Sequence, residues 1–154
     1  MNATSKASLW VHRLAVLLIA LMGVVSLSAG AQDKPYTEGS VWAITFIRVK
    51  PGMFDVYMRD VLPMRKKINE EARKQGLMLS SRVLSGNANG RDDWDVMLMD
   101  EYKNWAAFDG LSAKFDAIMS KVVGTEDKQV QVMTKRTEVR EIMGDKVMQE
   151  LIPK

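Results

Sequence analysis

The sequence contains no cysteine, and its single histidine is His12. Without cysteine the chain forms no disulfide and carries no lipoprotein anchor. Because we expect the segment holding His12 to be removed, the remaining chain has no histidine either. The two absences exclude Ser-His-Asp and Cys-His catalysis and ordinary zinc sites. The phosphate-binding patterns G-x-x-x-x-G-K-[ST] and G-x-G-x-x-G are also missing.

Charge of one sign is not concentrated anywhere along the chain. The protein has 22 basic and 19 acidic side chains, and two of the basic ones, Lys6 and Arg13, belong to the leading segment. The rest is therefore close to neutral. Since nucleic-acid binding depends on clustered lysine and arginine, we expect no nucleic-acid partner.

The first 31 residues have the three-part pattern of a secretory signal peptide. Their apolar run, over 14–25, is shorter than the roughly 20 residues of a membrane-spanning helix. Ala29 and Ala31 form the A-x-A pattern that precedes a cleavage site. We expect cleavage between Ala31 and Gln32 and a periplasmic or secreted protein, with membrane contact only through an uncleaved signal. The composition of residues 32–40 predicts a polar linker, and residues 41–152 are expected to form one domain.

Hydrophobic periodicity predicts alternating strands and helices in that domain. Pro63 is expected to kink or split the first helix near Val61, and Asn104 is expected to be the N-cap of the second. The predicted elements are strands over 41–50, 77–85, 93–102 and 146–152, and helices over 53–75, 105–123 and 126–142.

This order predicts an α+β, ferredoxin-like split βαβ antiparallel sheet with helices on one face. The first and third strands are apolar on both faces, which places them in the centre of the sheet. Helices cover one of those faces, and the other would meet water unless a second copy covered it. The pattern therefore predicts a homodimer.

Two short motifs give the chain a family resemblance. They are Val49-Lys50-Pro51-Gly52, which leads from a strand into a helix, and 102–108 (YKNWAAF) at the next strand-to-helix joint. With the element order they make residues 41–152 resemble the dimeric α/β-barrel superfamily, which includes NIPSNAP-like proteins, EthD-like proteins and antibiotic-biosynthesis-type monooxygenases. The resemblance implies a dimeric barrel that binds a ligand or catalyses a reaction. Haem-binding relatives use an axial histidine, so we expect neither haem nor another cofactor.

Aromatic walls with a few polar groups are typical of small-molecule sites. The leading hypothesis is that the dimer binds a small aromatic or apolar molecule without a metal, with packing in the core as the competing role of the same residues. The candidate pocket residues are Trp42, Phe46, Tyr57, Arg82, Trp94, Tyr102, Asn104 and Trp105.

Two alternative functions stay open. The resemblance to cofactor-independent monooxygenases implies an enzyme in which Tyr57, Arg82 or Asn104 polarises or deprotonates a phenolic substrate. Arg82 is informative, because it either faces solvent or needs a buried anion. A structural or protein-interaction dimer without a pocket is the other alternative.

Three further groups of residues have simpler interpretations. Asp92, Asp93 and Asp95 lack the ligand spacing of a calcium loop, so we expect a solvated turn. The thioethers in 97–99 suit copper(I), but methionine usually fills irregular space in a core. The basic and acidic residues of 64–74 indicate a solvated, salt-bridged helix face.

Overall fold

The computed structural model of the protein describes residues 33–154. The signal peptide and cleavage site predicted around residues 1–32 lie outside the described residues. In chain order, the elements are β1 (Tyr36–Val49), α2 (Phe54–Val56), the π-helical turn η1 (Tyr57–Val61), α3 (Leu62–Lys74), β2 (Ser80–Ser85), β3 (Val96–Tyr102), the 3₁₀ turn η2 (Trp105–Phe108), α4 (Leu111–Val122), α5 (Glu126–Val139) and β4 (Arg140–Pro153).

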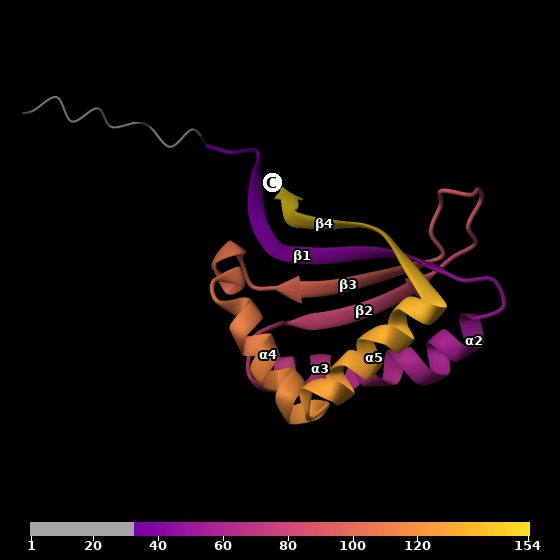
Figure 1. The fold of residues 1–154 in the computed structure, drawn as a ribbon. Coiled ribbons are helices and arrows are strands. Elements are labelled where there is room, and N and C mark those ends of the chain that lie inside the picture. Colours follow the sequence, from indigo (N-terminus) through magenta and orange to yellow (C-terminus); the bar gives the residue numbers. More distant parts are fainter. Residues whose placement is uncertain (1–32) are drawn as a thin grey trace, which may run out of the picture. The chain divides into compact units, whose positions relative to one another are not determined.

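The four strands form one antiparallel sheet in the order β2-β3-β1-β4. Figure 1 shows the helices together on one side of this sheet. This is the predicted ferredoxin-like fold, with the first and third strands in the centre.

The register of the central strands separates their side chains into two faces. Ile47 and Val49 of β1 are buried in the core beneath the helices. Trp42, Ile44 and Phe46 alternate with them and point to the face without helices. Their partners on β3 are Glu101, Met99 and Met97.

The first helix is split where Pro63 was expected to interrupt it. Residues 57–61 form the π-helical turn η1, closed by a hydrogen bond from the Leu62 N–H to the Tyr57 carbonyl. Proline has no N–H to donate to the preceding turn, so the helical hydrogen bonds change register just before it. The turn places Tyr57 and Val61 in the core.

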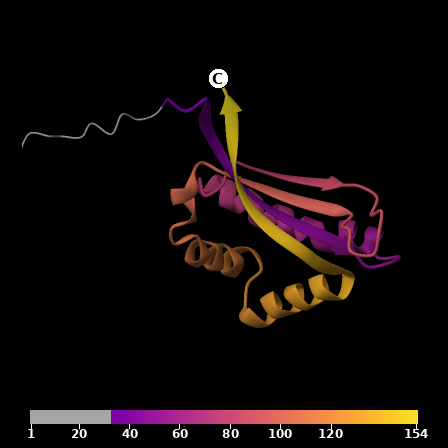
Figure 2. The same cartoon turned by 90° about the horizontal axis from the view of Figure 1, so that it is seen from above.

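Strands β1 and β4 are both longer than predicted, and the linker proposed for 32–40 is shorter. Residues 36–38 pair with residues 151–153 at the far ends of the two strands. A polar segment is extended here because a partner strand satisfies its backbone groups. β4 begins at Arg140 rather than at 146, directly after α5. In Figure 2 these far ends run side by side beyond the helices.

The helix predicted over 105–123 is divided as well. It begins as η2 and resumes as α4 after Gly110, whose φ of 63° lies in the left-handed region that favours glycine. Asn104 forms no side-chain capping bond, and its backbone carbonyl instead accepts from the Ala107 N–H at 3.1 Å. Its extended backbone therefore starts a tight turn, where capping by its side chain was expected.

Two clusters of buried side chains form the core between the sheet and the helices. One joins β1, β3 and η1 around Ile47 and Tyr57, and the other joins α3, α4 and β3 around Ala72 and Ile118. Within residues 33–154, no helix is both long and apolar enough to cross a membrane.

Candidate functional site

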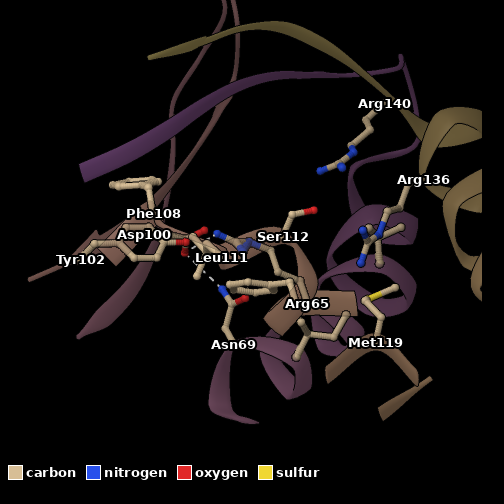
Figure 3. Close-up of a pocket in the computed structure, with 13 residues that line it drawn as sticks. Arg65, Asn69, Asp100, Tyr102, Phe108, Leu111, Ser112, Met119, Arg136 and Arg140 are labelled. Carbon is tan, nitrogen blue, oxygen red and sulfur yellow. Dashed lines mark hydrogen bonds and ion pairs between the residues drawn. The ribbon is translucent and has the colours of Figure 1, made fainter. Parts of the chain in front are cut away.

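An open cavity of about 580 Å³ lies between β3 and the three long helices. Figure 3 shows the residues that line it. The apolar part of the lining comes from β3, η1, η2, α3 and α4. These residues are Val61, Ile68, Tyr102, Phe108, Leu111, Phe115 and Met119.

A polar cluster from three elements lies along one wall. Arg65 Nη2 on α3 is 2.8 Å from Asp100 Oδ1 on β3. Asn69 Nδ2 donates to the same oxygen at 3.1 Å and to Ser81 Oγ at 2.8 Å. Asn69 is 7% exposed and is the one buried polar residue of the described chain. Because hydrogen bonds to charged groups are strong and directional, this cluster fixes the position of α3 on the sheet.

Burial has the largest effect on the pKa of Asp100. It raises the pKa of this carboxyl above its ordinary value, although Arg65, Ser81 and Asn69 each favour the ionised form. Burial and the nearby charge of Asp100 also raise the pKa of Tyr102 to about 12. The Tyr102 hydroxyl is therefore neutral at physiological pH and is a poor base.

Two further arginines lie on the opposite side of the cavity. Arg136 is on α5, and Arg140 follows at the start of β4. Arg140 Nη1 is 3.4 Å from the Tyr57 hydroxyl, and its guanidinium lies 5.8 Å from the centre of that ring. Burial, together with the positive charges of Arg140 and Arg65, lowers the pKa of Arg136. Figure 3 shows both guanidinium groups facing the cavity from this side, with Arg65 and Asp100 across from them.

The chain resembles two dimeric ferredoxin-like proteins. A dimeric protein of unknown function with a ferredoxin-like fold, from Bacteroides fragilis, is 16% identical with a TM-score of 0.42, over 75% of this chain and 98% of that chain. A dimeric ferredoxin-like protein from an uncultured marine organism is 15% identical with a TM-score of 0.45, over 75% and 96%. No protein-family model and no curated protein sequence matches the chain. The likeness is one of fold.

Of the eight candidate pocket residues, Tyr102 lines this cavity. Tyr57 is fully buried behind it, where its hydroxyl meets Arg140. Trp105 is 51% exposed and donates from Nε1 to Gln149 Oε1 at 2.8 Å. Asn104, beside it, is exposed. These residues lie near the helix side of the sheet without converging on one point.

The remaining four candidates belong to the face without helices. The rings of Phe46 and Trp94 have their centres 5.0 Å apart. Arg82 is exposed, and its guanidinium lies 5.2 Å from the centre of the Trp42 ring. Arg82 therefore stacks on an aromatic ring at the surface and is not a buried cation that needs an anion.

Sequence reasoning missed the polar half of the cavity. The sequence predicts a solvated helix face over 64–74, and Lys66 does form an exposed pair with Glu70 at 3.8 Å. Arg65 and Asn69, however, share a stripe with the buried Ile68. That spacing is visible in the sequence. So is the position of Asp100 between buried residues on one face of β3.

The carboxylates near the turn before β3 serve the backbone. Asp93 accepts from the N–H groups of Asn89 and Trp94, both at 2.8 Å, which lowers the pKa of its carboxyl. Asp95 Oδ1 accepts from the Val49 N–H at 2.9 Å. Among residues 33–154, no three acidic or histidine side chains gather as they would around a metal ion.

Proposed function

We propose that this protein binds a small molecule with an apolar or aromatic body in the cavity between β3 and helices α3, α4 and α5. The observation that carries the proposal is the composition of the cavity wall. The volume of the cavity, about 580 Å³, lies within the range of small-molecule sites. Aromatic and aliphatic side chains form most of the wall, and a few polar groups face the cavity, with Arg65 on one side and Arg136 and Arg140 on the other (Figure 3). This is the usual arrangement in such sites.

A neutral fluorescent probe, N-phenyl-1-naphthylamine, tests this proposal. Ser112 lines the cavity at the first turn of α4 and is exposed, so Ser112→Trp places an indole at the opening without disturbing the core. Ser120→Trp is the matched control, because Ser120 is exposed on the same helix and does not line the cavity. We expect saturable binding to the wild type and to Ser120→Trp, and at least tenfold weaker binding to Ser112→Trp. Equal binding by all three proteins would place the probe elsewhere and refute the proposal.

The protein is further proposed to act as a homodimer, with a second copy on the face of the sheet that has no helices. Within the described chain this face carries aromatic and thioether side chains from the two central strands. Met148 of β4, opposite Trp42, adds an exposed apolar side chain to this face, and the far ends of β1 and β4 carry the exposed Leu151 and Ile152. Such a two-stranded extension is marginally stable on its own. Both Glu101 and Lys146 point to this face by register, so an identical surface can match it in charge.

Sedimentation velocity at micromolar concentration tests the dimer. Met148 lies opposite Trp42 and is 51% exposed, so Met148→Glu places a charge in the proposed interface. Val130→Glu is the control, because Val130 is 58% exposed on α5, on the other side of the sheet. We expect a dimer for the wild type and for Val130→Glu, and a monomer for Met148→Glu. A monomeric wild type would remove this proposal.

Export remains part of the proposed function because of the signal pattern in residues 1–31. The mass of the intact protein, recovered from the compartment outside the inner membrane, tests it. We expect a chain that begins at Gln32. A chain that keeps residues 1–31 and stays in the cytoplasm would contradict export.

A further inference from the structure

The charges around the cavity do not balance. Three guanidinium groups line it, from Arg65, Arg136 and Arg140, and Asp100 is the one carboxylate in the lining. Asp100 forms its ion pair with Arg65. Within residues 33–154, no carboxylate forms an ion pair with Arg136 or Arg140. The cavity therefore carries an excess of positive charge that the described protein does not neutralise.

The two arginines without an ion pair lie close enough to repel each other. Arg136 is half-buried, and the charges of Arg140 and Arg65 both oppose its positive charge. Like charges brought together in a partly buried site destabilise the fold unless an anion joins them. An anion placed between them would relieve this repulsion and gain charge-assisted hydrogen bonds.

The start of α4 supplies a second, independent feature. The helix begins at the cavity with Leu111 and Ser112. Its N-cap is Gly110, which has no side chain to accept from the first backbone N–H groups, and no side-chain capping bond forms. Free N–H groups and the positive end of the helix dipole both favour an anion at this position.

We infer that the molecule bound in the cavity carries an anionic group, a carboxylate or a phosphate, held by Arg136, Arg140 and the first turn of α4. This inference rests on the proposed function and deepens it. The apolar body of the ligand lies against Phe108, Phe115 and Met119. Its anionic group faces the arginines, whose planar forks can each donate two hydrogen bonds to one oxyanion. The ligand class is therefore an amphiphilic acid with an aromatic or aliphatic body.

Four naphthalene compounds with a common body test this inference by titration calorimetry. They are 1-naphthoate, 1-naphthyl phosphate, the neutral 1-naphthylmethanol and the cationic 1-naphthylmethylammonium. We expect at least one anion to bind about ten- to one-hundredfold more tightly than the alcohol, since hydrogen bonds to charged groups are worth that much. The cation is expected to bind most weakly. The two anions distinguish a carboxylate ligand from a phosphate ligand.

Variants then locate the charge. Arg136→Gln and Arg140→Gln should each lower the affinity for the preferred anion about tenfold and leave the affinity for the alcohol unchanged. Arg140→Lys keeps the charge, so it should retain more of the affinity than Arg140→Gln. Lys128→Gln is the control, because it removes the same charge from an exposed position on α5 outside the cavity. Circular dichroism verifies that each variant is folded.

The outcomes separate the two proposals. If the anions and the alcohol bind equally, and Ser112→Trp weakens both, the cavity binds small molecules but the inferred anion site is wrong. If no compound binds, or Ser112→Trp has no effect on any of them, the proposed function itself fails. Loss of anion binding in Lys128→Gln to the same extent as in Arg136→Gln would also reject the site, because the effect would then come from net charge alone.

Discussion

The negative charge of Asp100 should lower the affinity of the cavity for anions, and replacing Asp100 by asparagine makes this effect measurable. The substitution keeps the size of the side chain, and the amide oxygen still accepts from Arg65 and Asn69. It removes the one negative charge of the cavity lining. We therefore expect Asp100→Asn to bind 1-naphthoate more tightly than the wild type does.

The size of the gain follows from the geometry. The inferred anion contacts Arg136 and Arg140, across the cavity from Asp100 (Figure 3), and a cavity of about 580 Å³ is roughly 10 Å wide. At an effective dielectric constant of about 20–40, two unit charges about 10 Å apart repel by roughly 1–2 kcal/mol. Because the cavity is open to solvent, the lower end applies, and we expect about a fivefold gain in affinity.

Calorimetry with 1-naphthoate and 1-naphthylmethanol measures this gain. Asp116→Asn is the matched control, because Asp116 is exposed on α4 and outside the lining. It should leave both affinities unchanged, and Asp100→Asn should leave that for the alcohol unchanged. An affinity for 1-naphthoate that stays the same or falls in Asp100→Asn, with the alcohol unaffected, would refute the idea that charge balance controls the site.

Three other predictions concern pH and the core. Because burial raises the pKa of Asp100, the carboxyl of the folded protein becomes protonated at a higher pH than that of the unfolded chain. The affinity for naphthalene-1-sulfonate, which stays ionised, should therefore rise as pH falls through that raised pKa. Asp100→Asn should abolish the rise. Absorbance at 295 nm should show a tyrosine that ionises at about 12 and is lost in Tyr102→Phe; its persistence in that variant would contradict the assignment. Urea unfolding should show that Val139→Ala, at a position 4% exposed, lowers the free energy of unfolding by about 1–2 kcal/mol. Val130→Ala on the same helix, at a position 58% exposed, should change this free energy by less than about 0.5 kcal/mol. Equal losses would contradict the burial of Val139.

The fold was predictable because the distribution of apolar residues on each strand indicates which of its faces are buried. β1 is apolar on both faces, and it lies in the centre of the sheet with helices on one side. The ends of β1 and β4 were not predictable in the same way. Residues 36–38 are polar, and they are extended because residues 151–153 pair with them. Local sequence does not encode a pairing between segments so far apart.

The candidate site was harder to predict for a related reason. The predicted pocket collects aromatic residues by type, but the alternation of the strands places Trp42 and Phe46 on one face of the sheet and Tyr102 on the other. The arginines of the cavity resembled ordinary surface charges in the sequence. Their convergence depends on the packing of α3 against β3 and on the turn from α5 into β4.

The pairing of β1 with β4 also has a consequence for how the chain acquires its structure. Thr37 donates to the Ile152 carbonyl across 115 positions of sequence. A central strand that is synthesised early therefore pairs with a strand that is synthesised much later. Closing so long a loop is entropically unfavourable and slows folding. We expect nascent chains that stop before residue 140 to remain sensitive to protease, and chains in which residues 140–153 have left the ribosome to become resistant.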